Sequence, residues 1–146
     1  MIVKIHGSLA GVEKDQALIE VNGITYGVLI SKAVAAELLS TGAVGKEMTL
    51  HTLSYIEGNP GMGNLTPRLV GFPDKTDLDF FSMLTTVQGL GVKKALRALA
   101  IPVRDVARAI ELNDIATLKN MPEIGGENCA EDYRGTPGKS NALCSY

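Results

Sequence analysis

The first 72 residues consist of short runs of β-branched and other apolar residues, interrupted by turn signals. The Asn22-Gly23 pair is the strongest of these signals, because both residues tolerate the positive φ angles that a two-residue hairpin requires. Residues 13–15 mark another turn, and residues 34–39 have the spacing of a short helix. About five short strands in a segment of this length predict a small closed barrel of the OB type, which we assign to residues 1–72.

The last two predicted strands, residues 48–55 and 65–71, flank a long loop. Residues 57–64 are so rich in glycine, proline and asparagine that we expect no regular structure there.

The period of the apolar residues changes from that of strands to that of helices after residue 72. Thr76, with Asp79 three residues later, fits the start of a first helix. Further helices are predicted over residues 92–100, from Pro102 onward, and over residues 114–119 with Asn113 as the cap. The chain is therefore expected to combine a barrel and a small all-α domain in an α+β fold.

A glycine turn separates the first two predicted helices. Gly89 and Gly91 flank Leu90, and Val92 then starts a helix whose first turn carries two lysines, Lys93 and Lys94. Glycine permits a tight turn and the close approach of an anion, while the start of a helix offers unpaired N–H groups and partial positive charge. The motif lacks the spacing and the Ser or Thr of a nucleotide P-loop, so a phosphate of a diester backbone is the favoured ligand. A plain helix cap followed by a helix start is the alternative interpretation of such a turn.

A second glycine turn, at residues 122–126, indicates an imperfect internal repeat of helix, turn and helix. It contains Gly125 and Gly126 as candidate phosphate-binding positions. We assign the helical domain, with an incomplete second turn, to residues 73–126. Residues 127–146 have no apolar stripe and are expected to form an irregular tail.

Composition narrows the classes of function. The net charge of −2 argues against a protein that coats DNA without selection, yet residues 88–108 contain five basic side chains and one acidic one. We expect no metal site, because Cys129 and Cys144 have no partners at zinc-ligand spacing, and we expect no cofactor and no catalytic residue. The chain has no membrane-spanning run and no signal peptide, so a cytoplasmic location without membrane contact is predicted.

The order and spacing of several motifs resemble the RuvA family, which binds four-way (Holliday) DNA junctions in bacteria. The resemblance covers residues 1 to about 125. It includes the opening Met-Ile-x-x-Ile-x-Gly, residues 18–26, His51-Thr52, Leu69-Val70-Gly71-Phe72, Gly89-Leu90-Gly91-Val92-Lys93 and residues 118–125.

The resemblance implies an OB-like barrel, a domain with two helix-hairpin-helix motifs, and a tethered third domain. It implies a flat homotetramer that holds the junction open for a RuvB-type ATPase motor and a RuvC-type resolvase. The protein itself would then be a non-catalytic subunit of a branch-migration complex in recombination and DNA repair. Gly89, Gly91 and Lys93 match the first hairpin fully and are expected to hold duplex phosphates.

This chain departs from the family pattern at three places. Glu57 matches the first residue of an acidic pin that repels phosphate, but Gly58 occupies the position of the second acid. In the second hairpin Glu123 replaces a glycine, and Gly126-Glu127 replace a basic pair. The resemblance also leads us to expect that the third domain, which contacts the motor in the family, is absent from this chain.

Two other classes of function stay open. The barrel and first helices would serve as an oligomerisation or protein-interaction module if the altered second hairpin leaves DNA binding too weak. An enzyme is a third possibility, since helix-hairpin-helix glycosylases share the phosphate hairpin, but the chain offers no base-flipping pocket with a placed Asp or Lys.

The tail suggests a testable genetic origin. Read one nucleotide later, the codons of residues 127–140 permit a basic residue, then Thr and Ala, then a helix similar to that of the family. We hypothesise that the tail is a frameshifted reading of the second hairpin and of the segment beyond it. Sequencing of the coding DNA is expected to reveal the family pattern in that frame; stop codons or unrelated residues there would reject the hypothesis.

Overall fold

The structure is a computed structural model that describes residues 1–121, and it divides into two compact units, Met1–Leu78 and Asp79–Tyr146. The second predicted hairpin, the tail, Gly125, Gly126 and both cysteines lie outside the described residues. The predicted domain boundaries at residues 72 and 126 stay predictions. Within the described part of the chain, no helix is long and apolar enough to cross a membrane.

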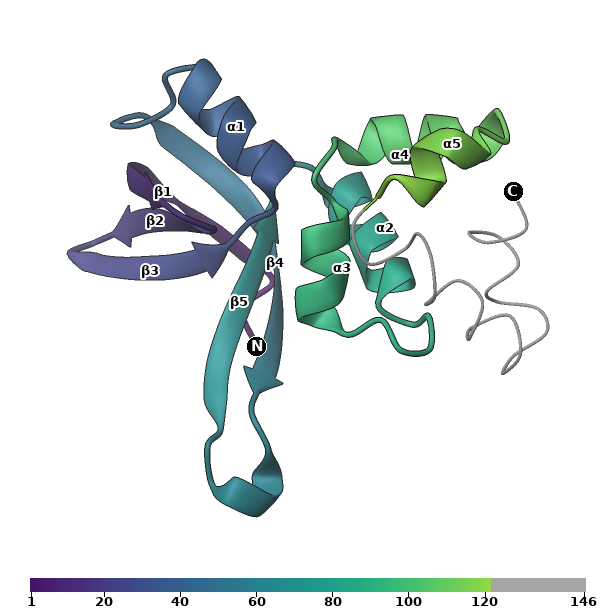
Figure 1. Cartoon of the computed structure of the whole chain (residues 1–146). Helices are drawn as coiled ribbons and strands as arrows, with labels where there is room; N and C mark the ends of the chain where they lie inside the picture. The colour runs from purple at the N-terminus through teal and green to yellow at the C-terminus, as the bar shows by residue number, and fades with distance from the viewer. Residues whose placement is uncertain (122–146) are drawn as a thin grey trace. The chain divides into compact units, whose positions relative to one another are not determined.

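The first unit is a closed five-stranded barrel (Figure 1). Its strands are β1 (Lys4–Glu13), β2 (Gln16–Val21), β3 (Ile24–Leu29), β4 (Glu47–Glu57) and β5 (Thr66–Phe72). They are joined in the order β1-β2-β3-β5-β4, and β4 pairs with β1 to complete the circle. All neighbours are antiparallel except β3 and β5, which are parallel. The predicted fold class, α+β with an OB-like barrel followed by helices, is confirmed.

The turns that shape the barrel follow from local sequence. Asn22 and Gly23 have φ angles of 51° and 83°, and Val21 pairs with Ile24 directly across the turn. This is the two-residue hairpin that the sequence predicts. Lys14 also has a positive φ, 52°, at the turn between β1 and β2.

The barrel interior is filled by apolar side chains that alternate along the strands, as expected for a sheet with one face inward. The fully enclosed residues include Leu9, Ile19, Val28, Leu50, Val70 and Phe72. Helix α1 (Lys32–Ser40) lies between β3 and β4 in sequence, where residues 34–39 predict a helix. The hydroxyl of Ser31 accepts a hydrogen bond of 3.2 Å from the N–H of Val34 and caps this helix.

The β4–β5 hairpin extends beyond the barrel, at the opposite end from α1 (Figure 1). Its tip contains a 3₁₀ turn, η1 (Pro60–Met62), where the sequence predicted no regular structure. The reason is local capping: the side chain of Asn59 accepts a hydrogen bond of 2.9 Å from the N–H of Gly61, and Gly63 closes the turn with a φ of 70°. Prolines favour the start of such a turn, because their φ is already fixed near the helical value.

The second unit contains the helices that follow the barrel. The helices are α2 (Lys75–Leu84), which begins within the first unit, α3 (Val92–Ala98), α4 (Val103–Glu111) and α5 (Ile115–Lys119). Phe81, Leu84, Leu99 and Val106 in this part of the chain are fully buried.

Two predicted caps are wrong, and in both cases the true first turn is set by a neighbouring residue. Thr76 lies inside α2, because the carbonyl of Asp74 already accepts the N–H of Leu78. Asn113 has a φ of 54° and lies in the turn after α4, so Asp114 caps α5 instead. Helix α3 is also two residues shorter than predicted at its C-terminal end.

Two glycines of β1 provide a matched test of barrel packing. A Cβ on Gly7 would collide with the backbone carbonyl oxygen of Glu20 and lie 2.8 Å from Cγ2 of Val21, whereas a Cβ on Gly11 would meet no atom within 4 Å. We expect Gly7→Ala to lower the free energy of unfolding by about 1–3 kcal/mol, because the strands must move apart. Gly11→Ala should change it by less than about 0.5 kcal/mol.

Urea denaturation followed by circular dichroism measures both values. Equal free energies of unfolding for the two variants would contradict this account of the packing between β1 and β2.

Candidate nucleic-acid interface

The turn between α2 and α3 is built from backbone hydrogen bonds and one glycine in a left-handed conformation. The N–H groups of Thr86, Val87 and Leu90 donate to carbonyls of the preceding turn, at 3.1–3.2 Å. Gly89 has a φ of 79°, which side-chain-bearing residues rarely adopt. Leu90 turns inward and is 6% exposed, so it anchors the turn to the helical core.

Gly91 begins α3 without providing a capping side chain. Its φ and ψ of −74° and 175° are extended, and no side chain caps the helix there. A Cβ at this position would meet no atom of the described chain within 4 Å, so the fold itself does not require glycine here. The space beside Gly91 is therefore open to a group from outside, and a helix start favours an anion in such a place.

Lys93 and Lys94 lie in the first turn of α3, and Arg97 is exposed one turn later. Lys93 and Arg97 are four residues apart, which places them on the same side of the helix. The structure thus brings the predicted residues Gly89 to Lys94 together in one turn. Their role in binding phosphate stays a prediction.

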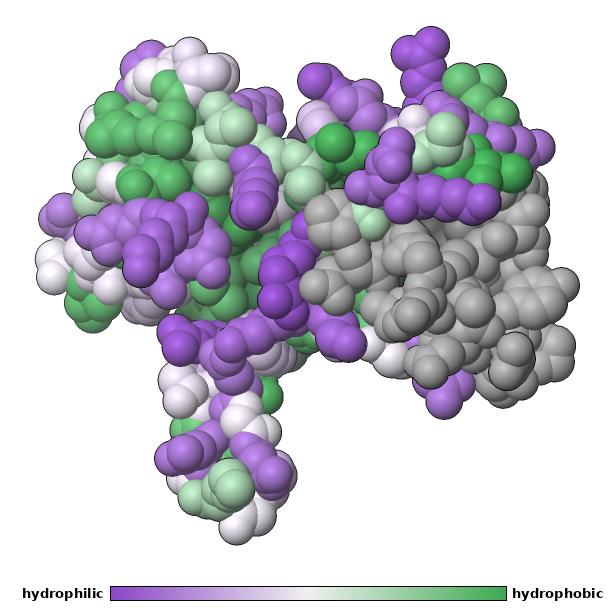
Figure 2. All heavy atoms as spheres, in the orientation of Figure 1, coloured by the Kyte–Doolittle hydropathy of each residue, from purple (hydrophilic) through white to green (hydrophobic). Residues whose placement is uncertain are grey.

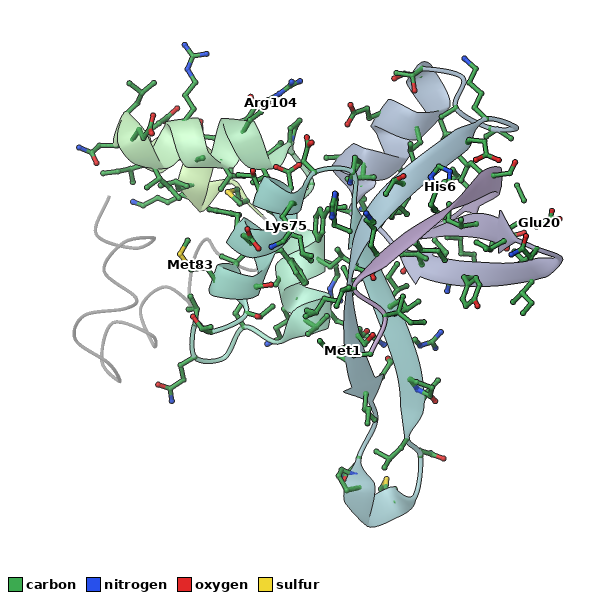
Figure 3. The ribbon with its side chains drawn as sticks, turned by 180° about the vertical axis from the view of Figure 1, so that it is seen from behind. Met1, His6, Glu20, Lys75, Met83 and Arg104 are labelled. Atoms are coloured by element: carbon green, nitrogen blue, oxygen red, sulfur yellow. The ribbon has the colours of Figure 1, made fainter. Side chains whose placement is uncertain are left out.

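The five basic side chains of residues 88–108 are divided between two helices. Arg104 and Arg108 belong to α4, which begins beyond the C-terminal end of α3 (Figure 1). The seven residues of α3 span about 10 Å, so these arginines lie well away from the glycine turn. Arg104 extends outward from α4 in Figure 3.

Glu57, the predicted acidic pin, lies at the end of β4 and is paired with a cation. Nε of Arg68 donates to Oε2 of Glu57 at 2.8 Å across the β4–β5 hairpin. The side chains of the pair are 39% and 23% exposed. The pairing compensates the charge that a repelling pin requires. The sequence did not indicate this contact, because it depends on the hairpin register that sets Glu57 opposite Thr66.

Gly58 adopts a conformation that excludes side chains. Its φ is 126°, and a Cβ there would collide with the backbone carbonyl of Asn64. The hairpin in its present form therefore cannot hold a second acid next to Glu57.

A second polar cluster lies on the outer face of the barrel, at β1 and β4. Nδ1 of His6 is 2.7 Å from Oγ1 of Thr49, and Nε2 of His6 is 2.8 Å from Oε2 of Glu47. The side chains of His6 and Glu47 are 60% and 71% exposed, so water competes for these contacts and the cluster is a surface network. Among the described residues, no group of three or more potential ligands is placed to hold a metal ion.

Asp114 caps α5, the helix that leads toward the second predicted hairpin. Its Oδ2 accepts a hydrogen bond of 2.6 Å from the hydroxyl of Thr117, and its Oδ1 accepts the N–H of Thr117 at 3.2 Å. These bonds favour the charged carboxylate, the hydroxyl bond most, and they lower the pKa of Asp114 below its usual value.

Comparison with known proteins identifies the relatives of this chain. Residues 1–59 match the family described as the RuvA N-terminal domain. The chain is 30% identical over 144 residues to the Holliday junction branch migration complex subunit RuvA of Treponema denticola, covering 98% of this chain and 67% of the relative. The chain belongs to the RuvA family.

Other RuvA relatives are more similar over a shorter span. The subunit of Rhodopirellula baltica is 42% identical over 125 residues, and that of Lachnospira eligens 36% over 126 residues. Each match covers 86% of this chain, but 59% and 56% of the relative. The chain therefore spans less than two thirds of the length of these relatives.

The hydroxyl of Thr117 provides a test of the α5 cap. Because the folded pKa of Asp114 is lowered, the cap stabilises the fold above the pKa of the unfolded chain, and this contribution is lost as pH falls through the folded pKa. Thr117→Val removes the stronger hydrogen bond, so the pKa of Asp114 should rise toward its usual value. Thr117→Ser keeps the hydroxyl and should keep the pKa low.

Carboxyl chemical shifts measured by NMR during an acid titration report the pKa directly. The same titration midpoint in the valine and serine variants would show that the hydroxyl does not cause the shift.

Proposed function

We propose that this chain binds four-way DNA junctions as the non-catalytic scaffold of a branch-migration complex in recombination and repair. The observation that carries the proposal is the α2–α3 turn of a RuvA-family chain. It combines Gly89 in a left-handed conformation, an uncapped Gly91 with open space beside it, and two lysines in the next turn.

The turn would hold DNA through its phosphates. Backbone N–H groups at the start of α3 donate to phosphate oxygens, and Lys93 and Lys94 add positive charge. Because Gly91 has no side chain, the sugar-phosphate chain of the DNA can approach the protein backbone closely there. Such contacts depend on where the phosphates lie and not on the identity of the bases. Recognition is therefore by the shape and charge of the DNA.

Selection of a junction over a linear duplex would come from assembly. One turn is a weak site, but four copies in a homotetramer would present several turns to several duplex arms at once. After the first contact the others form at high effective concentration, so their affinities combine. Gly125 and Gly126 would contribute a second, weaker contact, because the basic pair expected after Gly125 is replaced by Gly126-Glu127.

The partners in the proposal are those of the branch-migration complex. A RuvB-type ATPase supplies the motor and a RuvC-type resolvase cleaves the junction, both as separate proteins in the cytoplasm. This chain supplies the junction contact. Glu57 would act on the DNA only weakly as an acidic pin, since Arg68 compensates its charge.

Reversal of one charge in the turn tests the proposal. Lys93→Glu should lower junction affinity by at least about tenfold, because it removes a phosphate contact and adds repulsion. The slope of the logarithm of the binding constant against that of the salt concentration should become shallower by about 0.9 for each lost contact. Gel shifts on four-way and linear DNA over a range of salt concentrations measure both effects.

Lys46→Glu is the matched control. Lys46 is exposed on the barrel unit, and its substitution changes the net charge equally. An equal loss in both variants would point to net charge rather than to the turn. Absence of junction binding by the unaltered chain, together with a stable oligomer in sizing experiments, would favour the assembly module instead.

A further inference from the structure

The tip of the β4–β5 hairpin carries no charge. Residues 58–67 contain no acidic or basic side chain, and the nearest charged residues, Glu57 and Arg68, are paired with each other. Figure 2 shows pale and green residues along the tip between patches of hydrophilic side chains. Such a tip neither attracts phosphate nor repels it strongly.

The same tip exposes large apolar side chains. Met62 is 78% exposed, Leu65 51% and Ile56 67%. All three lie in or next to a segment that extends beyond the barrel (Figure 1), away from the barrel core. Exposed apolar side chains gathered on one projection are typical of a contact surface.

The tip is folded, so it can present Met62 in a defined place. The N–H of Met62 donates to the carbonyl of Asn59 at 3.0 Å, and Asn59 and Gly63 cap the two ends of η1. The side chain of methionine is itself flexible and polarisable, which suits insertion between flat surfaces.

The position of the tip in the barrel indicates its partner. It is the loop between the fourth and fifth strands of an OB-like barrel, one of the loops with which OB folds contact oligonucleotides. Proteins that distort DNA insert apolar side chains, methionine among them, between base steps. An uncharged tip with exposed apolar side chains fits the face of a base better than it fits a phosphate.

We propose that the hairpin tip inserts Met62 against bases that are unstacked at the branch point of the junction. This inference rests on the proposed function, because it assumes that the chain binds junction DNA. In this proposal the tip separates bases with an apolar side chain. Electrostatic repulsion of phosphates would contribute little, because Arg68 compensates the charge of Glu57. Leu65 would support the same contact from the β5 side of the tip.

The experiment uses the full chain and a four-way junction with 2-aminopurine at the nucleotides next to the branch point. This base fluoresces more strongly when it is unstacked. Binding of the unaltered chain should raise the emission, and Met62→Ser should abolish most of the rise. Junction affinity, measured separately by gel shift, should change by less than about threefold, because phosphate contacts carry most of it.

Two further variants test whether the effect depends on an apolar side chain and on its position at the tip. Met62→Leu keeps an apolar side chain and should keep the rise in emission. Met83→Ser removes an equally large methionine, 58% exposed, from α2 and should also keep it. Circular dichroism of each variant confirms that it folds.

The outcomes distinguish the two proposals. If the unaltered chain binds the junction but the 2-aminopurine emission does not rise, or rises equally with Met62→Ser, the wedge is overturned. The proposed function then still stands. Failure of the unaltered chain to bind the junction overturns both. A change in oligomeric mass on Met62→Ser, without a change in emission, would assign the tip to contact between copies and also overturn the wedge.

Discussion

The parallel pairing of β3 with β5 is the constraint on which the first unit depends. It consists of two residue pairs, Val28 with Leu69 and Leu29 with Val70, and it joins segments that are distant in the chain. Without it β3 and β5 would be open edges, and the inward residues of the sheet would face water. With it, β5 is held from both sides, so the β4–β5 hairpin leaves the barrel in a fixed direction. The tip and its apolar side chains thus owe their placement to a short pairing far from them.

Local chemistry made much of the fold predictable. Asn22 and Gly23 predict their own turn, because their tolerance of positive φ is a property of the residues themselves. The alternation along the strands and the helical spacing after residue 72 are equally local. The resemblance to the RuvA family added the order of the parts, which periodicity alone does not provide. The helix caps were predicted less well. Asn and Asp are both common N-cap residues, and only the backbone geometry after α4 decides between Asn113 and Asp114.

The site was predictable only in part, for a physical reason. The α2–α3 turn is contiguous in sequence, so its glycines and lysines could be found together. The pair of Glu57 and Arg68 is not contiguous, since it exists only after β4 and β5 adopt their register. The excess of basic residues over residues 88–108 also says little about how these side chains are arranged. Lys93 and Lys94 are close in sequence to the arginines of α4, but they lie at the start of α3 and α4 follows its other end.

The conformation of Gly58 limits how this hairpin can evolve. A single nucleotide change can convert a glycine codon into one for an acidic residue, so an acidic pin of two residues is genetically close. The folded hairpin rejects such a product, because the backbone at residue 58 leaves no room beside Asn64. An acidic residue at position 58 would require a change in the length or path of the loop. The path of this loop and the absence of an acid at position 58 are therefore linked.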